Sequence, residues 1–514
     1  DTNPLCNPCM SLNYNFIWLL CYLLVLVGLA GYGFHRLSIV YLYWKNRNNK
    51  PQPKARFQEL PVVTVQLPMF NEKFVVDRLL ESVAALDYPQ DKLEIQILDD
   101  STDDTTEQCY RKVEELKSRG FDAVCIHRTD RTGFKAGALE AATKVAKGEF
   151  LLILDADFVP EPDLLQKTIH FFTDENVGLV QTRWGHINRE YNLLTRIQGM
   201  YLDGHFAMEQ TARNRSGRFF TFNGTAGIWR KCVIGDAGGW SHDTLTEDMD
   251  LSYRVQLKGW RFIYLNDVVT PAELPVDMDG FKSQQHRWTK GSIQVCQKIL
   301  LDIWRSNAPL KAKVEATTHL TCNYSYLLLA LLCFLVYPIC TQRIPENETV
   351  FMWFVNVALF FMTSVAVCIF YMSAQIVVRP KSWWKELPYL PLLLTLSVGM
   401  AVNNAKAVLE AIFGHQSAFV RTPKYGVDRK EDRRHVSQLK RNGYRAIKSV
   451  VIPVLEIACG TFFLNLIIIM IRQGHYLSPI LMIPFLGFYY TGFCSLGRMI
   501  SNLLPAKQTA KAKN

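Results

Sequence analysis

Two kinds of hydrophobic pattern divide this chain. In residues 57–305, short apolar runs alternate with longer segments in which apolar residues recur at helical spacing. The short runs are typical of buried strands and the longer segments of amphipathic helices. Outside that block, the apolar positions fall into long runs with almost no charge, which are typical of membrane-crossing helices. The chain therefore combines one soluble block with several apolar helices.

The soluble block has a regular order of elements. We expect strands over residues 62–67, 93–98, 123–127 and 150–154, and a helix after each of them, over residues 72–86, 103–119, 134–146 and 161–172. Strands that alternate with helices form parallel sheets with helices on both faces. The pattern therefore predicts an α/β domain over residues 57–305, and such domains bind ligands at the carboxyl ends of their strands.

The uncharged runs predict about five membrane spans, near residues 16–35, 324–340, 350–378, 450–472 and 477–498. The first run is long enough to cross about 30 Å of hydrocarbon. Basic residues follow it rather than precede it, which favours a retained anchor over a cleaved signal peptide. By the positive-inside rule, residues 1–15 lie outside or in a lumen, and the soluble block lies in the cytoplasm.

Residues 387–413 are apolar in their first half and carry polar residues in their second half. If they crossed the membrane, residues 421–448 would lie outside, although these hold ten lysines and arginines and three acidic residues. Such a basic segment favours the cytoplasmic side. We therefore expect residues 387–413 to form an amphipathic helix at the cytoplasmic interface, with a shallow re-entrant turn before it left open, and the C-terminus to lie in the cytoplasm.

The formal charge of +10 fits this arrangement. Much of it lies beside the predicted spans, where the anionic lipids of a cytoplasmic leaflet attract lysine and arginine by about 1 kcal/mol per residue. The expected partner is therefore a lipid bilayer, and nucleic acid is not expected. The pattern predicts an integral protein of a plasma, inner or Golgi membrane.

Acidic residues follow two of the predicted strands. Asp99 and Asp100 end the second strand, and Asp155 and Asp157 follow the fourth, so both pairs lie at the edge where such sheets bind ligands. Carboxylate oxygens suit Mg²⁺ or Mn²⁺. A nucleoside diphosphate sugar needs such an ion to neutralise the charge on its diphosphate as that group leaves. Lys135, at a helix start, adds a positive charge for phosphate. The alternatives are that the Asp99 pair caps the following helix and that Lys135 is a surface residue.

Six motifs carry a resemblance to a known family. They are Gln66-Leu-Pro-Met-Phe-Asn-Glu72, Gln96-Ile-Leu-Asp-Asp-Ser-Thr-Asp103, Gly133-Phe-Lys-Ala-Gly-Ala-Leu139, Phe222-Asn-Gly-Thr-Ala-Gly-Ile-Trp229, Thr246-Glu-Asp-Met-Asp250 and Gln284-Gln-His-Arg-Trp288. In this order and spacing they resemble glycosyltransferase family 2, in its processive cellulose synthase-like branch, and above all the plant-type mannan and xyloglucan-backbone synthases and their bacterial relatives. The resemblance covers roughly residues 60–305 and implies a nucleotide-binding α/β fold of the GT-A type.

For the donor nucleotide sugar, the resemblance implies that the base is held by Phe70, Glu72 and Asp99. It also implies that Asp155 and Asp157 lie at the metal and the diphosphate. The cofactor expected on both grounds is therefore Mg²⁺ or Mn²⁺.

Further donor contacts come from the last motif and from a loop. The resemblance places Gln284 and Arg287 near the donor, and the guanidinium group suits bidentate contact with a diphosphate. Residues 419–425 resemble the mobile loop that covers the donor in cellulose synthases, so Thr422 and Lys424 are expected to reach the diphosphate. The alternative is a structural turn at Thr422.

The catalytic residues follow from the motif of Thr246, Glu247 and Asp248. The resemblance implies that Asp248 is the general base, which takes the proton of the acceptor hydroxyl and contributes roughly 10²–10⁴-fold to the rate. A single displacement inverts the anomeric carbon, so an α-linked donor yields a β-linkage. The alternative is that Thr246 and its two acids cap a helix, and both roles can hold together.

For the acceptor, the resemblance places Trp288 under the terminal sugar, with Phe222 and Gly224 of the fourth motif beside it. Indole rings stack well on sugar rings. As an isolated pattern, the Arg287-Trp288 pair on a predicted helix over residues 281–304 is more typical of a membrane anchor.

The expected function is that of a processive inverting glycosyltransferase, which elongates a β-linked polysaccharide and exports it through a channel formed by residues 306–514. Relatives with these motifs use glucose or mannose donors. We take UDP-glucose as the first choice of donor and GDP-mannose as a close second. The alternatives are a non-processive transferase that loads a sugar onto a lipid carrier and a hyaluronan-like or chitin-like synthase with an N-acetylhexosamine donor. A homo-oligomer is left open.

Overall fold

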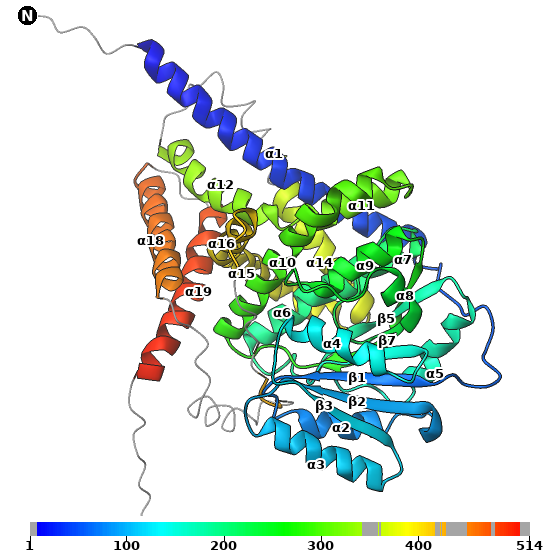
Figure 1. The fold of residues 1–514 in the computed structure, drawn as a ribbon. Helices are drawn as coiled ribbons and strands as arrows, with labels where there is room; N and C mark the ends of the chain where they lie inside the picture. The colour runs from blue at the N-terminus through cyan, green and yellow to red at the C-terminus, as the bar shows by residue number, and fades with distance from the viewer. Residues whose placement is uncertain are drawn as a thin grey trace, which may run out of the picture.

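The computed structural model describes residues 8–341, 358, 361–416, 422, 424–427, 450–473 and 479–503. An α/β domain lies at one end of the molecule (Figure 1). The apolar helices α12 (Tyr324–Thr341), α18 (Val451–Arg472) and α19 (Pro479–Leu503) gather at the other end, and α1 (Pro8–Asn46) runs beside α12. The division into a soluble block and apolar helices is therefore confirmed.

Seven strands form one mixed sheet. They are β1 (Val63–Met69), β2 (Leu93–Asp99), β3 (Asp122–His127), β4 (Phe150–Ile153), β5 (Val177–His186), β6 (Gly227–Arg230) and β7 (Arg261–Ala272). Their order is β3-β2-β1-β4-β6-β5-β7, and of these strands only β6 runs antiparallel to its neighbours. The four predicted strands are present and mutually parallel.

The expectation of a parallel sheet is wrong at β6. The segment before β6 already lies at the carboxyl edge of the sheet, because the hydroxyl of Thr225 accepts a hydrogen bond from the backbone N–H of Asp155 at 2.8 Å. A strand that starts at this edge has to run against the parallel strands. The antiparallel β6 therefore places residues 222–226 beside the acids that follow β4.

Helices cover both faces of the sheet. One buried apolar cluster joins it to α2 (Val76–Ala84), α3 (Thr105–Ser118) and α5 (Leu164–Thr168), and a second joins it to α4 (Phe134–Val145), α8 (Lys231–Asp236) and α9 (Glu247–Leu257). Along β4, Phe150 and Leu152 belong to the first cluster, whereas Leu151 and Ile153 belong to the second. This alternation is the two-residue period of a strand buried on both faces.

Further helices lie within the α/β domain or between it and the apolar end. They are η1 (Gln90–Lys92), η2 (Ile169–Thr173), α6 (Leu193–Asp203), the π-helix η3 (Gly204–Gln210), α7 (Thr211–Arg215), α10 (Met278–Arg305), α11 (Leu310–Thr321), η5 (Phe361–Val365), α14 (Ala366–Val378), η6 (Trp383–Tyr389), α15 (Leu390–Gly399) and α16 (Ala401–Ile412). The helix predicted over residues 281–304 is α10, which is confirmed with slightly wider bounds.

Two described helices are long and apolar enough to cross a membrane, Ile17–Asn46 and Val451–Arg472. The number rises to four if each of two bent pairs counts as one span, Leu310–Thr321 with Tyr324–Pro338, and Trp383–Gly399 with Ala401–Ile412. Helices are found at the predicted positions of the other spans, but the predicted count of five is not reached within the described residues. The chain thus carries apolar helices suited to a membrane.

Residues 387–413 form two helices, α15 and α16. The position of this segment at a membrane interface stays a prediction. α15 and α16 meet at an angle of 41°. The apolar α15 packs on α19, whereas Glu410 of α16 forms ion pairs with Lys290 at 3.1 Å and His286 at 3.2 Å on α10. The two halves bind different partners, which accounts for the bend.

Some predicted features lie outside the described residues. These are residues 1–7, most of the loop over residues 419–425, the basic segment from residue 428 to residue 449, and the first part of the span predicted over residues 350–378. The parts of that loop and span that the structure describes are residues 422 and 424–425, and η5 with α14.

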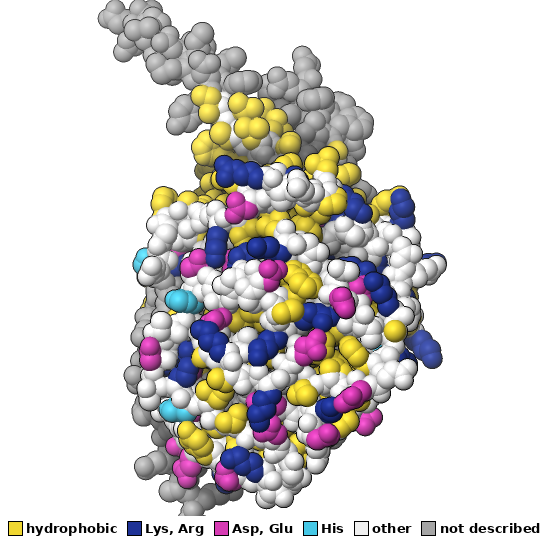
Figure 2. All heavy atoms as spheres, turned by 45° about the vertical axis from the view of Figure 1, so that its right-hand side comes forward, with side chains coloured by type: hydrophobic (Ala, Val, Ile, Leu, Met, Phe, Trp, Pro, Cys, Tyr) yellow, Lys and Arg dark blue, Asp and Glu magenta, His cyan; other side chains and the backbone are white. Residues whose placement is uncertain are grey.

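The surface of the molecule reflects the same division. On the face in Figure 2, lysine, arginine, aspartate and glutamate side chains are interspersed over most of the described surface. Hydrophobic side chains gather at one end of this face, and exposed apolar residues of α1 include Leu24 and Val27. Such an exposed apolar band suits contact with lipid.

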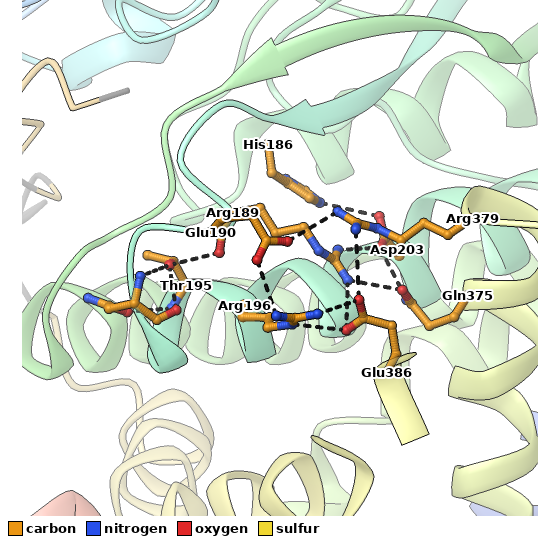
Figure 3. A network of polar contacts seen from close by, with 10 residues as sticks. His186, Arg189, Glu190, Thr195, Arg196, Asp203, Gln375, Arg379 and Glu386 are labelled. Atoms are coloured by element: carbon orange, nitrogen blue, oxygen red, sulfur yellow. Dashed lines mark hydrogen bonds and ion pairs between the residues drawn. The ribbon is translucent and has the colours of Figure 1, made fainter. Parts of the chain in front are cut away.

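A buried polar network joins the α/β domain to the apolar helices (Figure 3). Arg189, which follows β5, binds Asp203 of α6 at 2.6 Å and the side-chain oxygen of Gln375 on α14 at 3.0 Å. Arg196 of α6 donates two hydrogen bonds to Glu386 of η6, at 3.0 and 3.2 Å. We call these five residues the clasp. Because its charges lie in pairs, the clasp satisfies groups that would otherwise be costly to bury.

Replacement of Asp203 by asparagine tests the clasp. The Asp203→Asn variant leaves the buried guanidinium of Arg189 without its nearest carboxylate, so we expect a loss of about 3 kcal/mol in unfolding free energy. The measurement is denaturant-induced unfolding of the full chain in detergent micelles. Asp163→Asn is the matched control, since Asp163 pairs with Lys167 and both side chains are 49% exposed, and such pairs contribute less than about 1 kcal/mol. Equal losses in the two variants would contradict the assignment.

Candidate active site

The acids predicted at the strand ends lie at one edge of the sheet. Asp99 is paired in register with Met69 of β1, and the N–H of Leu154, just before Asp155, bonds to the carbonyl of Gln66 on the same strand. β1 lies between β2 and β4, and the three strands are parallel. Their carboxyl ends therefore lie together at one edge of the sheet. This is the position at which doubly wound sheets bind ligands.

Asp99 and Asp100 are both held by basic residues that follow β3. The carboxylate of Asp99 is fully buried and contacts the ring of His127 at 2.7 Å, and it also accepts a hydrogen bond from Thr106 at 2.7 Å. Arg128 binds Asp100 through two hydrogen bonds, at 2.6 and 2.8 Å. Asp99 is thus held in place by these two contacts. Its contact with a nucleotide base stays a prediction. The strand-end rule that selected Asp99 also selects His127 and Arg128, which sequence reasoning missed.

Phe70 and the loop before α4 form the other wall of that site. The guanidinium of Arg131 lies 3.4 Å from the centroid of the Phe70 ring, and the ring of Phe134 lies 5.4 Å from the same group. Asn71 and Phe134 adopt positive φ angles of 55° and 48°, which non-glycine residues rarely do. Strained backbone of this kind gathers at ligand sites. Arg131 is a further candidate for contact with a nucleotide, and Glu72 lies half-buried in the loop after β1 that also carries Phe70.

Lys135 brings the two halves of the site together. Its ammonium group forms an ion pair with Asp155 and donates a hydrogen bond to the carbonyl of Gly224 at 2.8 Å. Burial by itself lowers the pKa of Lys135, but the charges of Asp155 and Glu247 outweigh it, so its pKa lies above the ordinary value. Lys135 is therefore a charged residue whose side chain is only 17% exposed, and the surface alternative is wrong.

Gly224 lets Asp248 approach Lys135. A methyl group built on Gly224 would lie 3.1 Å from a carboxylate oxygen of Asp248 and 3.6 Å from the ammonium nitrogen of Lys135. Gly224 also has a φ of 79°, which favours glycine. The close approach therefore requires glycine here, and it places Asp155 and Asp248 around one ammonium group.

Asp248 lies in the first turn of α9. The N–H of Met249 donates to its carboxylate at 2.8 Å, whereas Thr246, which precedes the helix, makes no side-chain capping bond. Burial and the neighbouring charge of Glu247 raise the pKa of Asp248 to about 7, and the charges of Lys135 and Arg287 act in the opposite direction. A carboxylate with such a pKa is suited to accept a proton near neutral pH.

Lys424 reaches the second acid of the pair. Its ammonium nitrogen lies 2.7 Å from a carboxylate oxygen of Asp157 and donates to the carbonyl of Glu273 at 2.7 Å. The carboxylate of Glu273 accepts hydrogen bonds from the backbone N–H groups of Tyr425, Gly426 and Val427, at 2.9, 3.0 and 3.2 Å. Sequence reasoning missed Glu273, which follows β7 and anchors this segment. Thr422 is buried close to Gly280 at the start of α10.

The residues of the last motif divide between the donor side and a cavity. Trp288 and Gln285 line the cavity described below, and Trp288 also packs against Phe206 and its neighbours. Arg287 lies close enough to Asp248 to lower its pKa. Gln284 is half-buried and does not line the cavity. Its neighbour Gln285 does, although sequence reasoning did not assign it a role.

A cavity of about 570 Å³ opens beside Asp248. It begins at Thr246, Asp248, Phe222 and Trp288, and it continues between the apolar helices. The side chains that line it there come from α1, α12, α14, α15, α18 and α19, for example Leu26, Leu329, Val367, Leu394, Phe463 and Leu481. The candidate base and the candidate acceptor residue thus open into the same space.

Asp155 and Asp157 supply the hard oxygen ligands that Mg²⁺ or Mn²⁺ prefers. Within the residues that the structure describes, no third histidine, cysteine or acid joins them in a metal-binding group. Mg²⁺ is commonly bound by one or two carboxylates together with substrate phosphates and water. The residues present therefore fit a divalent ion that arrives with a diphosphate, and the side chain of Asp155 is 37% exposed for that contact.

Comparison with known proteins finds a family that resembles part of the chain. Residues 61–291 match the family described as Glycosyltransferase like family 2. Glucomannan 4-beta-mannosyltransferase 2 of Arabidopsis thaliana is 42% identical over 286 residues, which are 52% of this chain and 53% of that protein. Glucomannan 4-beta-mannosyltransferase 1 of Oryza sativa subsp. japonica is 41% identical over 277 residues, 53% of each chain. The chain therefore spans about half the length of these curated relatives.

Among solved structures, a similar one is the mannosyltransferase PcManGT from Pyrobaculum calidifontis in complex with GDP-Man and Mn²⁺. It has a TM-score of 0.54 and 20% sequence identity, and it covers 77% of this chain and 100% of its own. At this identity the likeness confirms the fold of the α/β domain, as the sequence predicted.

The anchor formed by Glu273 can be tested through amide exchange. In a Glu273→Gln variant the uncharged amide offers one weaker acceptor to three N–H donors, and hydrogen bonds to a charged group are worth about 1.5–3 kcal/mol. We expect hydrogen–deuterium exchange at residues 425–427 to rise about tenfold or more. Glu140→Gln is the control, because Glu140 accepts a backbone bond from Trp240 instead. Unchanged exchange in Glu273→Gln would show that this carboxylate does not hold the segment.

Proposed function

We propose that this chain, in which residues 61–291 match the family described as Glycosyltransferase like family 2, is a membrane-embedded inverting mannosyltransferase that extends a β-linked glycan from GDP-mannose. The observation that carries the proposal is the arrangement around Lys135. The acid expected at the metal forms an ion pair with this lysine, and the acid expected to act as base lies near enough for the charge of Lys135 to lower its pKa, at the mouth of a cavity.

The choice of donor reverses the order given by the sequence alone. Both curated relatives are named as mannosyltransferases of glucomannan, at 42% and 41% identity, and this favours GDP-mannose over UDP-glucose. Because the match covers only about half of the length of these relatives, the donor of the whole protein stays a proposal. The N-acetylhexosamine alternative has no support among these relatives.

The residues of the site account for each step of a single displacement. Asp248 takes the proton of the acceptor hydroxyl as that oxygen attacks the anomeric carbon. The indole ring of Trp288 stacks on the acceptor sugar. Asp155 and Asp157 would hold a divalent ion, which would neutralise charge on the departing diphosphate. Lys135, Lys424 and Arg287 add positive charge on the same side. Because no covalent intermediate forms, an α-linked donor gives a β-linked product.

The cavity supports export of the product. Its lining runs from Asp248 to side chains of the apolar helices, so a glycan that grows at Trp288 has a path between them. A hydroxyl-rich chain needs such a path because each unpaired polar group in hydrocarbon costs several kcal/mol. We place the α/β domain in the cytoplasm and the N-terminus on the opposite side, in keeping with the charge bias.

A second candidate is transfer to a lipid-linked acceptor. The part of the cavity between the apolar helices is lined by aliphatic side chains such as Leu26, Leu329 and Leu332. Such a lining also fits a hydrocarbon chain. Product that partitions into organic solvent favours the lipid acceptor, whereas water-soluble or precipitating polymer favours glycan elongation.

The donor and the base can be tested together. Purified full-length protein in lipid nanodiscs, supplied with Mn²⁺ or Mg²⁺, is offered labelled GDP-mannose and UDP-glucose, and we expect β-linked polymer from GDP-mannose. The Asp248→Asn variant keeps the shape of the side chain but cannot take the proton, so turnover falls roughly 10²–10⁴-fold. Asp243→Asn is the control, because Asp243 is exposed and makes a surface ion pair with Lys298. Polymer from UDP-glucose alone would overturn the donor, and full turnover in Asp248→Asn would overturn the base.

The pH dependence of the reaction follows from the raised pKa of Asp248. Below a pKa of about 7 the carboxyl keeps its proton and cannot accept another, so activity is lost as the pH falls and is restored as it rises. We expect kcat/KM for the acceptor to increase about tenfold per pH unit up to about pH 7 and then to level off. The dissociation constant of GDP-mannose, measured over the same range, serves as the control and should change little. A rate that is flat below neutral pH would exclude Asp248 as the titrating base.

A further inference from the structure

Helix α10, which carries the last motif, presents three faces to three different surroundings. Lys282, His286 and Lys290 lie four positions apart, a spacing that places side chains on one face of a helix. We call these three residues the basic stripe. The third face meets the segment that carries the candidate base. The second face lines the cavity, and its members are Gln285, Trp288, Thr289 and Ser292.

The third face of α10 packs closely on the segment around Asp248. A methyl group built on Gly291 would lie 2.5 Å from a side-chain carbon of Thr246, so this approach requires glycine. The side-chain oxygen of Gln294 accepts a hydrogen bond at 2.9 Å from the backbone N–H just before Thr246. Arg287 is close enough for its charge to lower the pKa of Asp248. The position of Arg287 relative to Asp248 therefore depends on how α10 is turned about its axis.

Lys282 holds one end of the basic stripe against the apolar helices. Its ammonium nitrogen lies 2.5 Å from a carboxylate oxygen of Glu456 on α18. The same nitrogen lies 2.9 Å from the hydroxyl of Ser495 and 3.1 Å from the carbonyl of Thr491, both on α19. An ammonium group has three N–H donors, and these three acceptors match them. The side chains of Lys282 and Glu456 are 5% and 0% exposed, so the start of α10 is fixed to two helices by buried polar contacts.

Glu410 of α16 holds the other end of the basic stripe. Its carboxylate lies 3.1 Å from the ammonium nitrogen of Lys290 and 3.2 Å from a ring nitrogen of His286. Burial lowers the pKa of His286, so the neutral ring donates a hydrogen bond to this carboxylate. The side chain of Lys290 is fully buried. The basic stripe thus meets an acid of a different helix at each of its ends.

Contacts of this kind fix position more than they add stability. Exchange of a buried ion pair for apolar residues of similar volume is often neutral or stabilising. A hydrogen-bonded ion pair differs from an apolar contact because it depends on direction as well as on distance. The end of a side chain lies about 6 Å from a helix axis, so a rotation of about 10° moves it by about 1 Å. A displacement of this size in an active site can cost about 100-fold in rate.

We propose that Lys282, His286 and Lys290 are positioning residues, which fix the rotation of α10 about its axis and thereby hold Arg287 beside Asp248. The face of α10 that lines the cavity borders open space and gives no support against such a rotation. The basic stripe acts through Arg287 and touches no reacting group itself. The inference rests on the proposed function in one respect, because it takes Asp248 as the base.

The test follows the titration of Asp248 without turnover. The full chain in nanodiscs is treated with a water-soluble carbodiimide and glycine ethyl ester at a series of pH values, and mass spectrometry quantifies the label at Asp248. Carbodiimides react with the protonated carboxyl, so labelling falls as the pH rises through the pKa of Asp248, which is about 7 in the wild type. The charge of Arg287 lowers this pKa, so removal of Arg287 from its place should raise the midpoint by about one pH unit.

Paired apolar substitutions remove each end of the basic stripe. The first pair is Lys282→Met with Glu456→Leu, and the second is Lys290→Met with Glu410→Leu. Each pair removes one positive and one negative charge and leaves no buried acid or lysine of the pair without its partner, so the fold is kept. We expect each pair to raise the midpoint by about one pH unit, as Arg287→Leu does. Added to Arg287→Leu, neither pair should raise the midpoint further, because the effect passes through Arg287.

Arg196→Met with Glu386→Leu is the matched control. This variant exchanges an ion pair between α6 and η6 in the same way, and it should leave the midpoint at the wild-type value even if it lowers stability. A purely structural role of the basic stripe predicts the same result for its two pairs. An unchanged midpoint in both pairs, an equal rise in the control, or a rise that adds to that of Arg287→Leu overturns the positioning role.

Because the labelling needs no donor, it separates this inference from the proposed function. If the chain does not transfer mannose but the midpoint responds as expected, the proposed donor fails and the positioning role stands. If the chain transfers mannose and the midpoint is unmoved in both pairs, the positioning role fails alone. A wild-type Asp248 that titrates like an ordinary aspartate overturns the base and the positioning role together.

Discussion

The candidate active site depends on the ammonium group of Lys135 and on the ion pair that it forms with Asp155. Carboxylates brought together in a buried site repel one another and take up protons unless a positive charge lies between them. Lys135 provides that charge, since it pairs with Asp155 while the absence of a side chain at Gly224 lets Asp248 approach. Burial and the charge of Glu247 nevertheless raise the pKa of Asp248. The same contact therefore joins the donor side to the acceptor side and sets the base for work near neutral pH.

The connection between the α/β domain and the apolar helices has an apolar part and a polar part, both of them buried. Apolar side chains such as Ile39, Met200 and Phe370 pack in one cluster. In the clasp, Arg189 and Arg196 bind partners on α14 and η6, and Arg36 of α1 forms an ion pair with Glu209 of η3. Buried ion pairs add little net stability, but they penalise any shift that separates the partners.

Much of the fold and part of the site follow from local sequence patterns. Short apolar runs separated by helical segments predicted β1 to β4 within one or two residues, because burial on both faces leaves few other choices for such runs. The strand-end rule brought Asp99, Asp155 and Asp157 to one edge for the same reason. The antiparallel β6 carries no comparable signal, since its four residues are too short for a period to show. The motifs themselves indicated Asp248 and Trp288, whereas Glu273 and Arg131 stand in segments without a recognisable motif.

By itself, the sequence determined the two-part organisation, the parallel core of the sheet and the residues that carry charge at its edge, because these depend on the periodicity of neighbouring positions. The tertiary structure alone decided which of those residues meet. Lys135 contacts a carbonyl 89 positions away, Lys424 contacts an acid 267 positions away, and Arg189 contacts a helix 186 positions away. Contacts at such separations depend on how whole elements pack, and no local pattern encodes them. The cavity is the clearest case, since its walls come from helices that span most of the chain.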